Sequence, residues 1–171
     1  MRANALVVAV VVLAAGVATT AAAAPRRAAC MPGQTKVDGH SAMTFCGPAK
    51  ATVHVAGKTL TFKGGSCLKT GTSLTVNIGT VVFGIVKQKP SYFGLDIGRY
   101  YGAGKGTPAA RRDGTYGGGL VVVRQHGLHY DLNGGADTDV KVTLKKSRTA
   151  GTFTGSTQFS PRVKVSGSFS C

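Results

Sequence analysis

The sequence predicts an all-β fold: an antiparallel β-sandwich of about nine short strands, stapled by two disulfides and preceded by a signal peptide. Three observations support this prediction. Glycine, serine, threonine and valine are abundant while glutamate is absent, a composition that favours strands and tight turns. Apolar and polar residues alternate in many short stretches, as they do in strands with one buried face. Four cysteines all follow an export signal, and an even number of cysteines in an exported chain is typical of paired disulfides.

The start of the chain has the order of a secretory signal peptide. A short positive stretch, Met1-Arg2, precedes an uninterrupted small and apolar run over 5–18, and an alanine-rich stretch follows. These features correspond to the n-region, the h-region and an A-x-A cleavage site. The apolar run is shorter than the roughly 20 residues that a membrane-spanning helix needs. We therefore expect cleavage between Ala23 and Ala24, with residues 1–23 removed.

Lipid attachment at Cys30 is the alternative to plain secretion. A lipoprotein signal carries an apolar residue three positions before the modified cysteine, but Arg27 stands there. We therefore expect an unlipidated protein that is secreted, either extracellular or associated with the cell envelope. Residues 24–34 are expected to form a flexible N-terminal arm. Residues 35–171 have the length of one ordinary domain and are expected to form a single β-sandwich.

The expected strands are short and bounded by turn residues. Two glycine turns, Ala56-Gly57 and His126-Gly127, each connect two alternating stretches and predict β-hairpins. Gly64-Gly65 predicts a bulge before Cys67. The continuous apolar run over 81–86 is expected to be buried on both faces or to lie at a sheet crossing. The alternating or apolar stretches that supply the strands fall at 53–55, 60–62, before Cys67, at 74–78, 81–86, 93–97, 120–123, 128–132, 140–144, around Phe153 and at 162–171.

Four cysteines, Cys30, Cys46, Cys67 and Cys171, allow three disulfide pairings. The alternation of the last stretch places Cys171 on its apolar face, and Cys67 ends another alternating stretch. We therefore predict a Cys67–Cys171 disulfide, which closes a loop of about a hundred residues. Cys30 and Cys46 would then form a local staple for the N-terminal arm. The cysteines are not spaced as the close C-x-x-C pairs that zinc sites use.

Two stretches of the sequence carry a family resemblance. The segments "LTFKGGSCLKTGTSLTVNIG" (60–79) and "DGTYGGGLVVVRQHGLHYDLNG" (113–134) are followed by a strand that ends in a cysteine. This order resembles the mycobacterial nineteen-kilodalton lipoprotein antigens over about 53–171. The resemblance implies an exposed envelope protein with a β-sandwich fold and no established catalysis. The chain departs from that family by lacking a lipobox and by carrying Cys30 and Cys46, and no site residues can be transferred.

The chain is strongly basic. Its 21 lysines and arginines outnumber six acidic residues and give a net charge of +15, which attracts anionic surfaces without defining a site. One long segment over 98–119 combines basic residues with tyrosines, a combination that binds anionic polymers by charge and by stacking. The alternative explanation is a solvated loop in a protein that is basic throughout. The candidate anion-binding residues are Arg99, Tyr100, Tyr101, Lys105, Arg111 and Arg112.

Three further motifs are similar to ligand sites but have simpler structural explanations. The stretch "GAGKGT" at 102–107 is similar to a phosphate-binding loop, but Pro108 follows it where such a loop opens a helix. His126 and His129 lack a defined third metal ligand. The segment 131–139 gathers three aspartates without matching the EF-hand pattern. We therefore expect turn and loop roles for these residues, and no nucleotide, cofactor or metal.

The sequence predicts a binding or structural role. It contains no G-x-S-x-G motif and no glutamate, and cysteines held in disulfides are not nucleophiles. The first hypothesis is a secreted or envelope-associated, non-catalytic β-sandwich protein. The second is a cationic binder of an anionic cell-wall polymer, lipid head groups or nucleic acid. The third is a secreted hydrolase, which would need a deep pocket with converging polar side chains.

Overall fold

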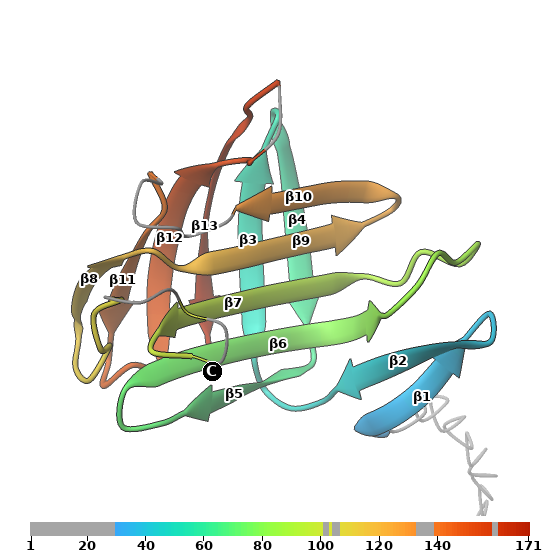
Figure 1. The fold of residues 1–171 in the computed structure, drawn as a ribbon, viewed down its shortest axis with the longest axis horizontal. Coiled ribbons are helices and arrows are strands. Elements are labelled where there is room, and N and C mark those ends of the chain that lie inside the picture. Colours follow the sequence, from blue (N-terminus) through green and yellow to red (C-terminus); the bar gives the residue numbers. More distant parts are fainter. Residues whose placement is uncertain (1–29, 101–102, 104–106, 133–138, 159–160) are drawn as a thin grey trace, which may run out of the picture.

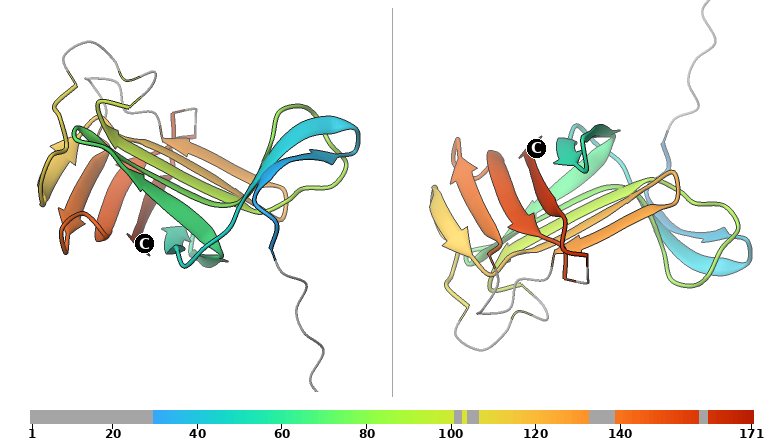
Figure 2. Two further views of the ribbon diagram at one scale, coloured as in Figure 1. Left: turned by 90° about the horizontal axis from the view of Figure 1, so that it is seen from below. Right: turned by 90° about the horizontal axis from the view of Figure 1, so that it is seen from above.

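The structure is a computed structural model that describes residues 30–100, 103, 107–132, 139–158 and 161–171. Within these residues the chain forms thirteen strands and no helix. The strands make two antiparallel sheets that pack as two layers (Figures 1 and 2). The predicted all-β antiparallel sandwich is therefore confirmed.

The first sheet has seven strands. Six of them follow the order β1-β2-β6-β7-β9-β10, and β5 also pairs with β6. The long strand β6 pairs with β5 along its first half and with β2 along its second half. The strands are β1 (Gly33–Val37), β2 (His40–Phe45), β5 (Gly65–Lys69), β6 (Ser73–Val82), β7 (Tyr92–Gly98), β9 (Leu120–Gln125) and β10 (Leu128–Leu132).

The second sheet has six strands in the order β4-β3-β13-β12-β11-β8. Its outer face is polar because threonine, serine and lysine alternate with buried apolar residues, as expected for a sheet with one solvated face. The strands are β3 (Lys50–Val55), β4 (Lys58–Lys63), β8 (Gly114–Gly117), β11 (Lys141–Lys145), β12 (Ala150–Ser156) and β13 (Lys164–Ser170).

The core lies between the inner faces of the two sheets. Phe93 of the first sheet contacts two aromatic rings of the second: its ring centroid lies 5.8 Å from that of Phe62 and 5.6 Å from that of Phe153. Aliphatic residues on the same faces of β6, β7, β9 and β11 are fully buried around these rings. This burial of apolar surface is the main stabilising contribution to the sandwich.

Both predicted disulfides are present. Cys67 and Cys171 have Cα atoms 5.6 Å apart, and Cys30 and Cys46 have Cα atoms 5.9 Å apart. The first disulfide joins β5 of the first sheet to the end of β13 in the second. The second closes the open end of the β1–β2 hairpin. Disulfides of this kind indicate an oxidising environment.

Both predicted glycine hairpins are found. Ala56-Gly57 connects β3 to β4 and His126-Gly127 connects β9 to β10, each with positive φ at both turn residues. The structure has more strands than the nine or so expected. The β1–β2 hairpin was missed because its strands are polar and largely exposed. β1 also begins at Gly33, within the segment expected to be a flexible arm, while residues 1–29 lie outside the described part of the chain.

The expectation for the apolar run 81–86 is wrong. Only Val81 and Val82 belong to β6, and the side chains of Phe83 and Ile85 are 63% and 94% exposed. The cause is the course of β6. Beyond Gly79 this strand pairs with β2, which belongs to a hairpin that contributes only Ala42 to the buried apolar residues among those described. The end of β6 therefore extends past the main core.

Candidate anion-binding site

Three loops meet at one end of the sandwich, at the lower left of Figure 1. Backbone hydrogen bonds hold two of them together, because the N–H groups of Arg99 and Ala110 both donate to the carbonyl oxygen of Thr72, at 3.1 and 2.8 Å. Gly98 permits this approach: its φ is +86°, and a Cβ atom there would lie 2.3 Å from the Thr72 oxygen. We call this part of the molecule the basic end, and it comprises residues 69–73, the described residues of 99–113, and 145–149.

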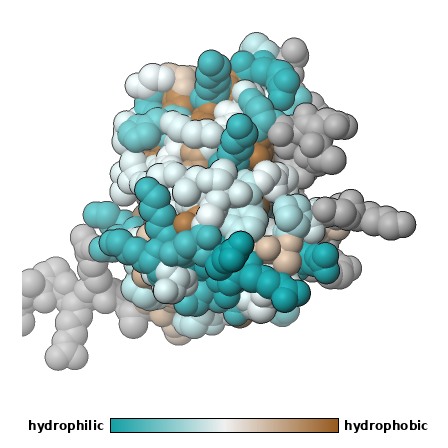
Figure 3. Space-filling view, turned by 90° about the vertical axis from the view of Figure 1, so that its left-hand side faces the viewer, coloured by the Kyte–Doolittle hydropathy of each residue, from teal (hydrophilic) through white to brown (hydrophobic). Residues whose placement is uncertain are grey.

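Seven basic residues belong to the basic end, and all except Arg148 are exposed. The ion pairs among the described residues involve Arg124, His129 and Arg162, so none of these seven is held by a carboxylate side chain in that part of the chain. Figure 3, which views the left-hand side of Figure 1, shows hydrophilic side chains gathered across the lower part of this face. The seven residues are Lys69, Arg99, Arg111, Arg112, Lys145, Lys146 and Arg148.

The β11–β12 turn within the basic end is strained. Lys146, Ser147 and Arg148 have consecutive φ values of 54°, 55° and 61°, a left-handed conformation that costs roughly 1–2 kcal/mol for each non-glycine residue. The Asp113 carboxylate accepts hydrogen bonds from the N–H groups of Ser147 and Arg148, at 3.0 and 2.7 Å. Backbone strain that is held in this way is concentrated at functional sites.

The side chain of Arg148 ties the strained turn to the other two loops. Its Nη1 donates to the carbonyl oxygens of Thr70, Ser73 and Ala110, at 2.9, 3.2 and 2.8 Å. Arg148 therefore has a structural task, since it satisfies carbonyl groups of the β5–β6 and β7–β8 loops. The neighbouring Lys146 is left exposed on a rigid turn.

The structure places four of the six predicted anion-binding residues in the β7–β8 loop. Arg99, Arg111 and Arg112 are exposed, and Tyr100 is half-buried. Burial raises the pKa of the Tyr100 hydroxyl, and the nearby charge of Asp96 raises it further. The remaining two residues, Tyr101 and Lys105, lie outside the described part of the chain, as does most of the GAGKGT stretch.

Sequence reasoning missed the basic residues that other loops supply. Lys69 and the 145–148 segment are far from residue 111 in sequence. The pairing of β11 with β8 brings the 145–148 segment to this end, and the hydrogen bonds from Arg99 and Ala110 to Thr72 bring the loop that follows Lys69. The run Lys145-Lys146-Ser147-Arg148 was the available signal. It lies directly after an alternating stretch, where a turn was expected.

A second polar cluster lies on the outer face of the first sheet. Arg124 of β9 donates from both terminal nitrogens to Asp131 of β10, at 2.5 and 2.9 Å, and His129 Nε2 lies 2.9 Å from the same carboxylate. Partial burial pushes the pKa of Asp131 upward, but the hydrogen bonds and charges of Arg124 and His129 outweigh it and lower the pKa overall. The Asp131 carboxylate is therefore ionised and paired with Arg124.

Tyr92 and Asp96 of β7 share that face. The Tyr92 hydroxyl donates to Asn77 Oδ1 at 2.6 Å, and burial is the main cause that raises the pKa of Tyr92 to about 12. Thr75 donates to Asp96 Oδ1 at 2.5 Å, but burial dominates and raises the pKa of Asp96. Neither residue shows the nucleophile–base pairing that hydrolytic catalysis requires.

The metal-binding motifs are not assembled in the described residues. These residues contain no group of three or more histidine, cysteine or acidic side chains that could hold a metal ion. His129 contacts Asp131, His126 occupies the β9–β10 turn, and Asp139 accepts hydrogen bonds from the backbone and side chain of Ser156. Asp137 lies outside the described part of the chain. Among the described residues, no helix is long and apolar enough to cross a membrane.

The fold and the site together define a disulfide-linked β-sandwich with a cationic loop cluster at one end. Comparison of the chain with protein-family models, with curated proteins and with solved structures finds no match. The resemblance to the nineteen-kilodalton lipoprotein antigens therefore stays a prediction, and the functional argument depends on the residues of this chain.

Proposed function

We propose that this chain is a non-catalytic binding protein, secreted or associated with the cell envelope, that holds an anionic polymer at its basic end. One observation carries the proposal: three loops from different parts of the sequence bring six exposed basic residues together around Arg148. Only Asp113 adds an acidic side chain among the described residues there, and both of its oxygens accept backbone hydrogen bonds.

The arrangement favours a polymer that is recognised by charge over one that is recognised by stacked bases. Single-stranded nucleic acids bind largely through aromatic side chains that stack on the bases. Of the described tyrosines between residues 98 and 119, Tyr100 is half-buried, and Tyr116 packs against the core and donates from its hydroxyl to the carbonyl oxygen of Arg112 at 2.8 Å. Arginine, in contrast, binds phosphate and carboxylate groups through a planar fork of donors. A phosphate- or carboxylate-bearing envelope polymer is therefore the proposed ligand.

The experiment measures retention of the mature protein on immobilised polyphosphate, on a polycarboxylate and on a neutral polysaccharide, across a salt gradient. We expect retention on the two anionic polymers that weakens as salt rises, because the screening length falls from ~10 Å at 0.1 M to ~3 Å at 1 M ionic strength. Retention on the neutral polymer that does not respond to salt would contradict the proposal. Tighter, sequence-dependent binding to single-stranded nucleic acid would favour nucleic acid as the ligand.

A further inference from the structure

The most exposed apolar segment of the described chain is the start of the β6–β7 loop. Four large apolar side chains among the described residues are exposed, and two of them, Phe83 and Ile85, belong to this loop. Isolated surface apolar residues are common and need no explanation, but protruding apolar clusters mark interaction sites. This loop lies at the right of Figure 1, and β6 separates it from the basic end. The ten residues of β6 span about 30 Å.

The loop is held in its exposed position by the β1–β2 hairpin. The Phe83 N–H donates to the carbonyl oxygen of Ser41 at 2.9 Å, and the Gln88 N–H donates to Asp38 Oδ2 at 2.8 Å. Between these two bonds, Gly84 has a φ of +152°, and a Cβ atom there would lie 2.3 Å from the His40 ring. The backbone on both sides of Ile85 is therefore fixed, so its exposure is built into the fold.

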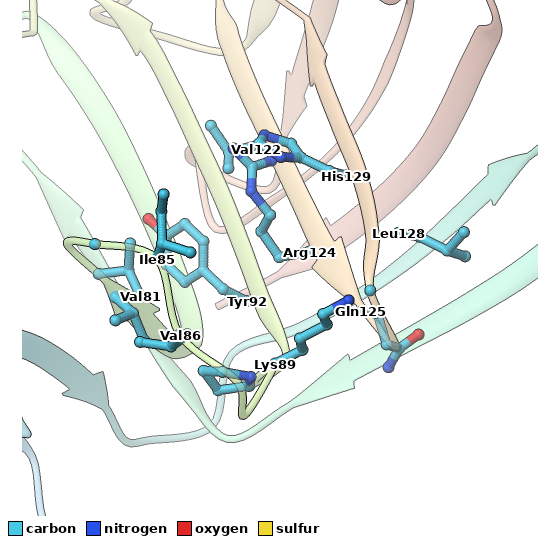
Figure 4. A pocket seen from close by; sticks show the side chains of 14 residues that line it. Val81, Ile85, Val86, Lys89, Tyr92, Val122, Arg124, Gln125, Leu128 and His129 are labelled. Carbon is cyan, nitrogen blue, oxygen red and sulfur yellow. The ribbon is translucent and has the colours of Figure 1, made fainter. Parts of the chain in front are cut away.

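Each exposed side chain stands beside a groove. Ile85, Val81 and Val86 line one side of a groove of about 390 Å³, and Tyr92 and Arg124 of the first sheet also line it (Figure 4). Phe83 lines a second groove of about 440 Å³ over the β1–β2 hairpin, together with Met43 and Lys36. The loop is thus a ridge between two grooves, with apolar side chains at its crest.

The surroundings of this ridge are positively charged. Lys36, Lys87 and Lys89 are exposed, and Lys89 lines the first groove together with Arg124 and His129 (Figure 4). The nearby acidic groups are already engaged: Asp38 accepts from the Gln88 backbone, and Asp131 is paired with Arg124 and His129. Lysine stems can lie along apolar surface while their ammonium groups stay in a polar layer. Apolar side chains surrounded by lysines are suited to the boundary between lipid head groups and acyl chains.

We propose that residues 83–86 are a membrane-docking loop, in which Phe83 and Ile85 enter the interface of an anionic lipid bilayer and Lys36, Lys87 and Lys89 contact the head groups. A ridge with apolar side chains at its crest fits a bilayer, which accepts a protruding shape, better than it fits a flat protein surface. Self-association through this loop would bring the lysines of two copies together and is disfavoured by repulsion. The site is separate from the anion-binding end, so one protein could contact a bilayer and an envelope polymer at the same time.

A single-tryptophan reporter gives the sharpest test, because the chain contains no tryptophan. Phe83→Trp is mixed with vesicles of phosphatidylcholine and phosphatidylglycerol, with and without brominated acyl chains. We expect a blue shift of the emission and quenching by bromine, and neither with phosphatidylcholine alone. The matched control is Leu68→Trp, because Leu68 is 64% exposed, close to the 63% of Phe83, but lies on β5. Unchanged emission of Phe83→Trp, or equal quenching of both variants, would overturn the proposal.

A second measurement distinguishes insertion of the loop into the bilayer from attraction of the basic protein to anionic vesicles and from self-association. Phe83→Ser with Ile85→Ser is made in a background whose basic end carries alanine at Arg99, Arg111, Arg112 and Lys146. It should reduce co-sedimentation with the anionic vesicles at least about tenfold relative to that background, since apolar burial contributes to interfacial binding. Leu68→Ser in the same background should sediment as the background does. The substituted side chains are exposed, and an unchanged thermal midpoint verifies folding. Vesicle binding that survives the double substitution would overturn the proposal, and so would loss of a dimer in analytical ultracentrifugation without loss of vesicle binding.

Discussion

Cys67 and Cys171 join the two sheets of the sandwich, with their Cα atoms 5.6 Å apart across 104 positions of sequence. The Cys171 N–H also donates to the carbonyl oxygen of Thr149 at 2.7 Å. Thr149 closes the strained β11–β12 turn that carries part of the basic end. The covalent link between the sheets is therefore continuous with the loops that we propose to bind an anionic polymer.

The two disulfides should differ in their effect on stability. Replacing Cys67 and Cys171 by serine should lower the free energy of unfolding by about 4–5 kcal/mol in the chain-entropy model, because this bond closes a long loop. Replacing Cys30 and Cys46 should cost at most about 3 kcal/mol, because the β1–β2 hairpin contributes no residue to the main hydrophobic core. Urea denaturation of both double variants under oxidising conditions measures the difference. Equal losses would contradict the assignment of the hairpin to the periphery of the fold.

Asp113→Ala tests whether polyphosphate binding at the basic end depends on the geometry of the β11–β12 turn or only on net charge. The substitution removes two hydrogen bonds that hold the strained turn, so we expect it to destabilise the protein by about 1–3 kcal/mol. Simple electrostatics predicts tighter binding of polyphosphate after loss of an acidic group. Our account predicts weaker binding, because the turn that carries Lys146 is released.

The control for this substitution is Asp139→Ala, which removes an equal charge. Asp139 precedes the first residue of β11, whereas the strained turn follows its last residue. Isothermal titration of both variants with polyphosphate compares them at the same net charge. If Asp113→Ala binds as tightly as Asp139→Ala, the turn geometry has no part in binding.

Asp96→Asn should stabilise the protein at neutral pH. Burial raises the pKa of Asp96 above its usual value of 3.8, so the folded state binds its proton more tightly than the unfolded state does. The charged carboxylate therefore lowers stability once the pH exceeds the raised pKa, and this cost disappears as pH falls below 3.8. Asparagine can still accept the hydrogen bond from Thr75. Urea midpoints should be higher for the variant at about pH 7 and equal at about pH 3, whereas a variant less stable at pH 7 would contradict this account.

Arg124→Met should have the opposite pH dependence. The pKa of Asp131 is lowered by its partners, so the ion pair contributes stability above the unfolded pKa, and this contribution is lost as pH falls through the lowered folded pKa. The two side chains are 29% and 28% exposed, so we expect a loss of only about 1 kcal/mol at neutral pH.

Arg162→Met is the matched control for Arg124→Met, because its 3.8 Å contact with Asp139 is longer and more exposed. It should change stability very little. Thermal melts of both variants at neutral and acidic pH compare the two ion pairs. Equal losses of stability at neutral pH would contradict the larger contribution that we assign to the Arg124–Asp131 pair.

The sequence predicted those parts of the fold that depend on neighbouring residues, namely the alternating strands and the glycine turns. The turns at Ala56 and His126 and the face of Cys171 were read from neighbouring residues. The run 81–86 was misjudged because burial depends on whether a second layer covers a strand, and hydrophobicity alone does not report this. Only part of the basic end was predicted, for a similar reason. The basic residues of the β7–β8 loop are close together in the sequence, whereas Arg148 is brought beside them by the pairing of β11 with β8.

The most direct test of the proposed anion-binding end compares the affinities of two charge-matched variants for polyphosphate at low salt. The first replaces Arg99, Arg111, Arg112 and Lys146 by alanine. The second replaces Lys36, Lys58, Lys141 and Lys164, which are exposed residues outside the basic end. Both variants lose four positive charges. We predict that the first binds at least about tenfold more weakly than the second, since each basic residue at an anionic surface contributes roughly 1 kcal/mol. Equal affinities would show that binding follows net charge alone and would contradict a site at this end of the sandwich.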